Sequence, residues 1–550
     1  MIRFNSFVLS LMVFTSLVGC STSRFLKKNP ANFSFEHATE YTELLPVNSF
    51  SIDELYDYCL SLPWENDNNI IAILNCSREL LGRKHLPQKQ RSNALSLYNN
   101  SLYTLVKADK TNRLNTDKIK LKYHNEIEFT LIEDLIALDE RLSPQIFGEL
   151  GVPIVTFREN SQKGQDKYLP LEGVTKDATI VLDNMPTFKD NTFHLHLSIQ
   201  QNNNITKLPL NHNLYSKRHS PAGAYLYLLN KANIDDYNWL GFFSSSQAEK
   251  RRGVFSINGI SKHKTPIIML HGLNSDPLIW RHLTMAIYNS PSLADKYQVW
   301  HVYYPSGLPP FYNAALTRNN LRSLLNETGI SSLAEQAIII GHSMGGVIAK
   351  LLSTEAKYEL WDTAFNQRPE NLIAPENMPL QNIFIYKPVF NQSTVFFLDT
   401  PFKGSEVASS AIGYIGAFLI SLPFDFKQLM KRFIDRVGPE ILTEKMRPFI
   451  IDHGPSSVQV LRPGHPLMET LYHLPVVGDS YAIIGSNGEL NCNTQQSCSL
   501  ITDGVVNFNS ANYLHANDRI IVSSTHNSFK NEQAIQYVLN KLLTLNFSNE

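Results

Sequence analysis

A serine flanked by glycines stands in residues 341–346, Gly-His-Ser-Met-Gly-Gly, and its surroundings are those of a nucleophile. The apolar residues 337–340 before it predict a short buried strand, and residues 347–352 after it predict a buried helix. A strand that turns sharply into a helix crowds the backbone, so a side chain at Gly341 or Gly345 would collide with the neighbouring strand or helix. This G-x-S-x-G pattern predicts that the Ser343 hydroxyl is raised clear of a sheet, beside the positive end of a helix.

A serine hydroxyl is a poor nucleophile at neutral pH, so Ser343 needs a base within hydrogen-bond reach and a carboxylate that orients this base. Among the 17 histidines, His526 is favoured as the base because it follows the last predicted strand, and His515 is the alternative. Asp503 is favoured as the carboxylate because it precedes His526 in a turn before a glycine. Asp399 also follows a predicted strand and is its competitor.

The elements that must hold these residues lie between residues 250 and 550, where apolar runs alternate with helical patterns. Such alternation predicts a mostly parallel sheet flanked by helices, with its chemistry at the carboxyl ends of the strands. The loop 271–273 follows one of these ends, and the backbone N–H groups of Leu273 and Met344 are the predicted oxyanion-hole donors. The predicted strands are residues 266–270, 297–304, 337–340, 394–398, 481–485 and 519–522, and the predicted closing helix is residues 532–543.

Residues 254–545 resemble the serine α/β-hydrolases of the lipase and esterase type, including their chain order of serine, aspartate and histidine. Within that group the chain is most similar to the GPI-inositol-deacylase-like bacterial lipoproteins. The resemblance implies a C-terminal α/β-hydrolase domain, residues 250–550, that cleaves carboxylic esters through an acyl-enzyme on Ser343, with no cofactor and no metal. An envelope scaffold that binds lipid or protein and keeps a vestigial triad is the alternative. The matching motifs are residues 271–273, 341–346, 400–405 and 503–506, and His526.

An insert at about residues 405–475 separates two predicted strands and carries the pattern of an amphipathic helix. Residues 411–422 are almost wholly apolar but too short to span a bilayer. A cap or lid over Ser343, which would suit an acylated or lipid-like substrate, and a helix packed permanently on the core are both compatible with this pattern. The apolar face consists of Phe426, Leu429, Met430, Phe433, Ile434 and Val437, and basic residues occupy the other face.

Residues 51–245 predict an α+β accessory domain to which no family function can be carried over. Its first part, up to residue 142 and including residues 127–136, has helix-like apolar spacing. His194 and His196 fall on one face of a predicted strand, where such a pair can bind a metal, but a solvated polar face is favoured. The predicted strands are residues 151–155, 178–182 and 192–199, and residues 244–250 predict a linker to the next domain.

Residues 1–20 have the pattern of an export signal. Arg3 precedes a mostly apolar stretch that is shorter than a membrane span. The stretch ends in Leu-Val-Gly before Cys20, which resembles the bacterial lipoprotein box. The resemblance implies lipidation of Cys20 and, with Ser21 next to it, an anchored protein of the bacterial cell envelope, on the outer membrane and facing the periplasm. An ordinary secretory signal is the alternative, and residues 21–50 are predicted to form a tether.

Composition and cysteine count narrow the remaining classes. The chain has 43% apolar and 18% charged residues, which is typical of a globular protein, and its formal net charge of −1 gives no general attraction to nucleic acid or to an anionic membrane. Phosphate-binding loops and zinc-type clusters are absent from the sequence. An even number of cysteines after Cys20 predicts disulfides in an exported chain. The simplest of the three connectivities pairs Cys59 with Cys76 and Cys492 with Cys498.

The lipoprotein box makes the first testable prediction. Cys20→Ser should release the protein from membranes into the soluble periplasmic fraction, because two or more acyl chains would supply the anchor. Fractionation of cells that express the variant or the unaltered chain measures this. A variant that still sediments with membranes would show that the accessory domain or the amphipathic helix binds lipid, or that the signal stays uncleaved.

Overall fold

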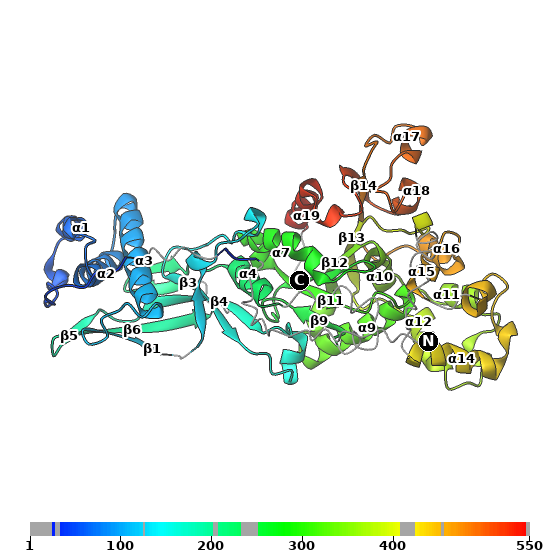
Figure 1. Cartoon of the computed structure of the whole chain (residues 1–550), viewed down its shortest axis with the longest axis horizontal. Coiled ribbons are helices and arrows are strands. Elements are labelled where there is room, and N and C mark those ends of the chain that lie inside the picture. Colours follow the sequence, from blue (N-terminus) through cyan, green and yellow to red (C-terminus); the bar gives the residue numbers. More distant parts are fainter. Residues whose placement is uncertain are drawn as a thin grey trace, which may run out of the picture.

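The structure is a computed structural model that describes residues 25–27, 34–124, 127–201, 207–232, 251–407, 424–452 and 456–545. A smaller N-terminal domain and a larger C-terminal domain follow one another along the long axis of the molecule (Figure 1). The export signal with Cys20, the linker at residues 244–250 and the apolar stretch 411–422 lie outside the described residues.

A seven-stranded sheet forms the centre of the larger domain; its strands are β9 (Gly253–Ser256), β10 (Thr265–Leu270), β11 (Tyr297–Tyr303), β12 (Gln336–His342), β13 (Gln392–Leu398), β14 (Ser480–Ser486) and β15 (Asp518–Ser523). Their order across the sheet is β15-β14-β13-β12-β10-β11-β9. Neighbours are parallel except for β9, which runs antiparallel to β11. The six strands predicted from the apolar runs are confirmed, and β9 is an edge strand that the pattern did not predict.

Helices cover both faces of this sheet, which explains why a strand such as β12 is apolar on both sides. One face, including Ile339 and Phe397, packs against α9 (Pro310–Glu327) and α10 (Met344–Ser353). The other face, including Ile340 and Phe396, packs against α7 (Arg281–Tyr288), α8 (Pro291–Lys296) and α19 (Glu532–Thr544). A parallel sheet between two helical layers, with a sharp turn from β12 into α10, is the α/β-hydrolase fold.

Two inserts build the helical cover at one end of the larger domain, where the sequence predicted only one (Figure 1). The predicted insert carries α14 (Phe424–Val437), α15 (Ser457–Val460) and α16 (Pro466–His473). The segment between α10 and β13 adds α11 (Glu359–Ala364) and α12 (Asn377–Phe384). A β-bridge between Phe365 and Leu442 and a 2.7 Å hydrogen bond between the hydroxyls of Thr363 and Thr470 join the two inserts.

The amphipathic helix α14 packs against the body of the domain. Met430 and Phe433 are buried in the same core cluster as α9 and α10, and Leu429 and Ile434 are half-buried against it. The Phe433 ring also contacts the ring of Phe365 edge to face. Of the two arrangements left open by the sequence, the structure therefore shows the packed helix.

The N-terminal domain consists of a second sheet covered by helices; its elements are α1 (Ile52–Ser61), α2 (Asp67–Gly82), α3 (Gln88–Lys110), β1 (Ile119–Tyr123), β2 (Phe129–Leu131), β3 (Val152–Arg158), β4 (Val174–Leu182), β5 (Thr187–Lys189), β6 (Thr192–Gln201), β7 (Lys207–Leu210) and β8 (Asn213–Ser216). The sheet order is β1-β6-β4-β3-β2, with β5 against β6, and β7 and β8 form a separate hairpin. The three strands predicted here are confirmed as β3, β4 and β6, and α2 and α3 share a core with one sheet face.

The helical part predicted to extend to residue 142 ends at Lys110, where α3 ends, and the helix predicted at residues 127–136 is wrong. Phe129 and Leu131 lie in β2, which pairs antiparallel with β3, and only one 3₁₀ turn follows, at Ile132–Asp134. A short apolar run suits a buried helix or a buried strand equally well, and here the neighbouring strand decides between them.

Residues 34–50, predicted as part of a tether, are packed against the accessory domain. Phe35 and Tyr41 contact its core. The buried carboxylate of Asp67 accepts hydrogen bonds from the Ala38 N–H at 2.9 Å and the Tyr41 hydroxyl at 2.7 Å, and it lies 3.0 Å from His37 Nδ1. A buried carboxylate without hydrogen-bond donors would cost free energy, so Asp67 holds in place the segment that supplies these donors. The tether prediction is therefore wrong for this stretch and for residues 25–27, which pair with residues 136–138.

Helix α4 (Pro221–Lys231) joins the two domains. It packs against β3 and β4 of the accessory sheet and against α7 of the larger domain. One buried core cluster includes residues of both domains, among them Tyr225 of α4 and Tyr288 of α7. Close by, His282 Nε2 lies 2.9 Å from the carboxylate of Asp139. The domains therefore share a core across their junction.

Both predicted disulfides are present. Cys59–Cys76 links α1 to α2, and Cys492–Cys498 closes a small loop between β14 and Asp503. Among the helices that the structure describes, none combines the length and the apolar character needed to cross a membrane.

The packing of α14 makes a prediction about stability. Phe433→Ala should lower the free energy of unfolding by about 3–5 kcal/mol, because it removes a fully buried ring from the core. Lys431→Ala, at an exposed position of the same helix, is the control and should change it by less than about 0.5 kcal/mol. Chemical denaturation measures both. An unchanged stability, together with a selective loss of activity on long-chain esters, would show instead that α14 is a freely opening lid.

Candidate active site

The nucleophile candidate stands on the turn between β12 and α10. Ser343 has φ 55° and ψ −125°, a strained conformation for a residue with a side chain. A Cβ at Gly345 would lie 2.3 Å from the Leu270 carbonyl oxygen, and one at Gly341 would lie 2.4 Å from the Gly345 carbonyl oxygen. Only glycine allows these approaches, as the sequence predicted. The turn places Ser343 at the carboxyl end of β12 and Met344 at the first position of α10.

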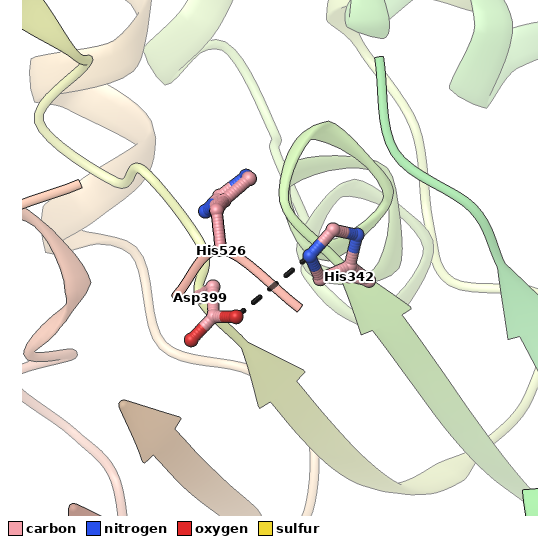
Figure 2. Close-up of side chains that lie close together, drawn as sticks. All are labelled: His342, Asp399 and His526. Carbon is pink, nitrogen blue, oxygen red and sulfur yellow. Dashed lines mark ion pairs between the residues drawn. The ribbon is translucent and has the colours of Figure 1, made fainter. Parts of the chain in front are cut away.

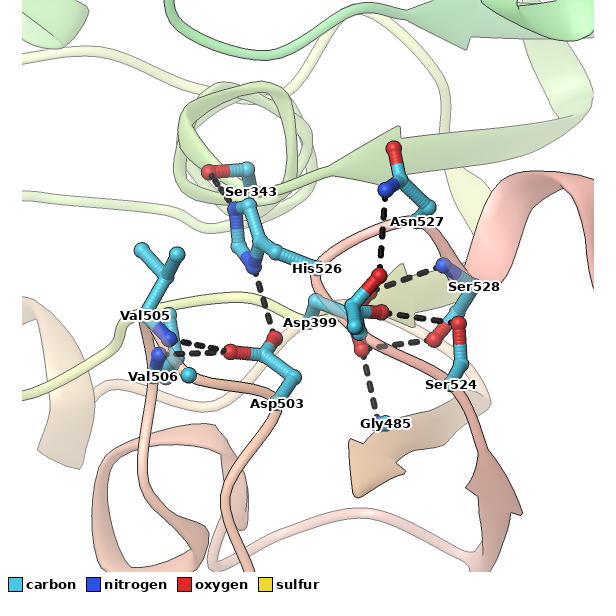
Figure 3. A network of polar contacts seen from close by, with 12 residues as sticks. Ser343, Asp399, Gly485, Asp503, Val505, Val506, Ser524, His526, Asn527 and Ser528 are labelled. Carbon is cyan, nitrogen blue, oxygen red and sulfur yellow. Dashed lines mark hydrogen bonds and ion pairs between the residues drawn. The ribbon is translucent and has the colours of Figure 1, made fainter. Parts of the chain in front are cut away.

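The structure brings the three predicted residues into one hydrogen-bonded chain (Figure 3). His526 Nε2 lies 2.8 Å from Ser343 Oγ, and His526 Nδ1 lies 2.6 Å from Asp503 Oδ2. An ionised carboxylate can only accept, so Nδ1 carries the ring proton and Nε2 accepts from the serine hydroxyl. The imidazole is therefore oriented to remove the proton of Ser343.

Asp503 is held in place by its own turn. Its second oxygen, Oδ1, accepts hydrogen bonds from the backbone N–H groups of Val505 and Val506, both at 2.7 Å. The side chain is almost completely buried. With one oxygen fixed by the turn, the other is directed at His526, so the turn at Asp503 helps to set the angle of the imidazole.

Asp399, the competing carboxylate, lies close by but has different partners. One of its oxygens accepts from the Gly485 N–H and the Ser528 hydroxyl, both at 2.8 Å, and the other accepts from the Ser528 N–H at 3.1 Å. Ser528 follows His526 by two positions. Asp399 therefore fixes the loop that carries the histidine, whereas Asp503 contacts the imidazole itself.

Burial and nearby charges shift the pKa values of the ionisable side chains at this site. Burial alone would lower the pKa of His526, but the hydrogen bond and charge of Asp503, with the charge of Asp399, raise it above its usual value. Burial, together with the nearby charge of Asp503, raises the pKa of Asp399 to about 6 against the opposing effects of His526 and Ser528. Burial also lowers the pKa of His342 well below its usual value, so that ring is neutral.

His342, Asp399 and His526 offer ligand atoms within 4.8 Å of one another, a spacing that could hold a metal ion (Figure 2). Both ring nitrogens of His526 are already engaged, by Asp503 and by Ser343. Asp399 likewise accepts three hydrogen bonds. A metal at this position would have to displace the hydrogen bonds of His526 and Asp399, so we assign His526 to the serine–histidine–aspartate chain and Asp399 to the support of its loop.

The predicted oxyanion loop lies against the nucleophile. A Cβ at Gly272 would be 3.2 Å from Ser343 Cβ, which brings the backbone of Leu273 to the same edge as Met344. The buried Tyr304 hydroxyl donates to the His271 carbonyl, and the Asn274 N–H donates to Ser306 Oγ at 3.1 Å. These bonds tie the loop after β10 to the loop after β11, so its N–H groups are held before any substrate binds.

The alternative base, His515, and the candidate metal pair, His194 and His196, have other neighbours. His515 is directed to the carbonyl of His473, 3.3 Å away, at the end of α16. His194 and His196 lie on β6 opposite Lys120 and Lys122 of β1, and those cations would oppose a metal. Among the described residues, the only group of three or more His, Cys, Asp or Glu side chains with metal-ligand spacing is the one at His342. The polar-face interpretation of the two β6 histidines agrees with this arrangement.

One positioning contact could not be predicted from the sequence pattern. Ser528 is completely buried, and both its N–H and its hydroxyl donate to Asp399. A serine two positions after a histidine carries no distinctive signal. Only the approach of β13, β14 and the loop after β15 reveals its role.

Comparison with solved structures finds distant similarities, among them two forms of one lipase and an esterase. The propeptide form of lipase BlEst2 from Bacillus licheniformis has 16% sequence identity and a TM-score of 0.31, over 54% of this chain and 55% of that chain. The mature form of that lipase has 14% identity and a TM-score of 0.27, over 52% of this chain and 97% of its own. The esterase RhEst1 from Rhodococcus sp. ECU1013 has 12% identity and a TM-score of 0.28, over 53% and 94% respectively.

The chain thus spans about half the length of the propeptide form of that lipase. No family model matches the chain, and comparison with curated proteins finds no match. The geometry of the site, rather than these similarities, carries the functional argument.

Substitution of Asp503 and substitution of Asp399 should affect turnover very differently. Asp503→Asn should keep the fold but reduce turnover by about 10⁴-fold, because an amide no longer holds the proton on His526 Nδ1. It should also move the acid limb of the kcat/KM profile to lower pH. His526 must be neutral to act as a base, so activity falls as the pH drops through its pKa, and loss of the Asp503 charge lowers that pKa.

Asp399→Asn is the matched comparison. It should reduce turnover far less than Asp503→Asn and should lower the melting temperature, because an amide must turn a donor toward the donors of Gly485 and Ser528. Steady-state kinetics over a pH series and thermal unfolding measure both variants. The reverse ranking of turnover, in folded protein, would assign the orienting role to Asp399.

Proposed function

We propose that this protein is a membrane-anchored serine hydrolase that cleaves carboxylic esters of acylated or lipid-like substrates. The observation that carries the proposal is the uninterrupted hydrogen-bonded chain from Ser343 through His526 to Asp503. A vestigial site would not need to keep a strained serine, a correctly protonated imidazole and a buried carboxylate together.

The proposed reaction follows from this geometry. Ser343 Oγ attacks the ester carbonyl carbon while its proton passes to His526 Nε2. The N–H groups of Met344 and Leu273 stabilise the tetrahedral oxyanion, and Asp503 stabilises the imidazolium. The intermediate collapses as His526 gives the proton to the leaving alcohol. Water, deprotonated by the same imidazole, then releases the acid from the acyl-enzyme and restores Ser343.

The cover over the larger domain favours an apolar acyl group. A cavity of about 40 Å³ lies beneath α14, lined by Phe311, Ile383 and Met430 among other apolar residues. His465 is one of its few polar residues, and burial lowers the pKa of that ring to about 4, so it is neutral. Pro309 lines the cavity and lies close in sequence to Ser306, which binds the oxyanion loop. The cavity holds only a few water-sized groups, so a long acyl chain would require α14 to move.

The finer parts of the proposal rest on sequence. The residues before and including Cys20 support a lipid anchor in the bacterial cell envelope, at the periplasmic face of the outer membrane. Residues 271–273, 341–346 and 400–405 support a GPI-inositol-deacylase-like character within the hydrolases. The second candidate function is the envelope scaffold with a vestigial triad.

A fluorophosphonate probe separates the two functions, because only an activated serine reacts with it. The wild-type protein should be labelled, and Ser343→Ala should lose the label. Ser523→Ala, at an exposed serine three positions before His526, is the control and should keep it. Hydrolysis of esters with increasing acyl length then defines the substrate class. Folded wild-type protein that takes no label would favour the scaffold.

A further inference from the structure

A short β-bridge holds the first described residues of the chain against the body of the protein. Leu26 pairs with Ala137 in antiparallel orientation. The Lys27 N–H donates to the Ile136 carbonyl at 2.7 Å, and the Leu138 N–H donates to the Phe25 carbonyl at 2.8 Å. The chain is therefore fixed at Phe25, only five positions after Cys20.

The inward side of this bridge is part of the domain junction. Ala137 is buried in the core cluster that both domains share, and Phe25 and Leu26 pack against that cluster. Leu135, two positions before Ala137, is buried in the same cluster. These contacts make the docked segment part of the folded protein rather than a loose extension.

The outward side is apolar although it faces solvent. Ile136 and Leu138 alternate with the buried Leu135 and Ala137, and their side chains are 37% and 48% exposed. Alternation of this kind normally places polar residues on the solvated side. Here the outward positions carry an isoleucine and a leucine, with the exposed Lys27 opposite Ile136.

Because this apolar surface lies close to the proposed anchor at Cys20, the partner that it implies is the lipid bilayer. A fully extended chain of five residues spans at most about 17 Å, so a lipid on Cys20 would keep Phe25 within that distance of the bilayer. We infer that the surface formed by Lys27, Ile136 and Leu138 rests against the lipid surface and fixes the orientation of the protein on the membrane. This inference rests on the lipid anchor of the proposed function.

The charges of the segment fit an anionic lipid surface. Arg24, Lys27 and Lys28 lie four, seven and eight positions after the proposed anchor at Cys20. Basic residues next to an anchor strengthen its attachment to anionic lipids, and half-exposed apolar side chains enter the interface. Other exposed apolar residues, such as Leu214 and Ile373, belong to segments that no such anchor holds at the membrane.

A spin label tests the contact on the full, lipid-anchored chain reconstituted in vesicles of phosphatidylethanolamine and phosphatidylglycerol. The cysteines at positions 59, 76, 492 and 498 are in disulfides and Cys20 would carry the lipid, so Leu138→Cys adds one free thiol for a nitroxide. Leu214→Cys, at an exposed leucine on β8 of the same domain, is the matched control. Power saturation compares collisions with oxygen, enriched in lipid, and with a water-soluble nickel chelate.

The label at position 138 should collide more with oxygen than with the nickel chelate, and the label at position 214 should show the reverse. Unanchored Cys20→Ser protein without vesicles should give an aqueous signal at both positions. Vesicle-bound protein with position 138 as water-accessible as position 214 would overturn this inference alone. Wild-type protein that does not bind the vesicles would overturn both the anchor and this surface.

Discussion

The close approach of α10 to the end of β10 is the constraint on which the site depends. Gly345 packs onto the carbonyl oxygens of Leu270 and His271 so tightly that no side chain fits between them. The same approach forces Ser343 into its strained backbone conformation and brings the loop after β10 beside it. Nucleophile and oxyanion loop are therefore positioned by one packing contact. The parallel register of β12, β13, β14 and β15 then delivers the histidine and both aspartates to the same edge.

Much of this arrangement could be predicted from the sequence because the signals are local. Buried parallel strands are continuous apolar runs, and the turn at Ser343 needs glycines at fixed positions. The predictions that the structure contradicts depended instead on contacts between residues that are distant in the sequence. Residues 127–136 have helix-like spacing, but pairing with β3 makes part of them a strand. Residues 34–50 are part of the predicted tether, yet Asp67, beyond their end, binds two of their donors. The helices α11 and α12 are too short for their periodicity to stand out.

The choice between Asp503 and Asp399 shows where sequence reasoning stops. Both residues follow a strand of the same sheet, so both reach the edge where His526 lies. The difference is in hydrogen bonds made after the chain has folded. Val505 and Val506 occupy one oxygen of Asp503 and leave the other for the imidazole. Ser528 and Gly485 occupy both oxygens of Asp399. One carboxylate thus orients the ring while the other orients the loop that carries it.

Through the core that the two domains share, the accessory domain also supports the catalytic loop. Helix α7, against which α4 packs, lies in the same helical layer as α19, and α19 follows directly after the His526 loop. His282 of α7 is almost completely buried and has Asp139 of the accessory domain as its partner. Separation of the domains would leave this imidazole without that carboxylate and would expose Tyr225 and Tyr288 to water. The accessory domain therefore stabilises the layer behind the catalytic loop, and the two domains are best regarded as one cooperative unit.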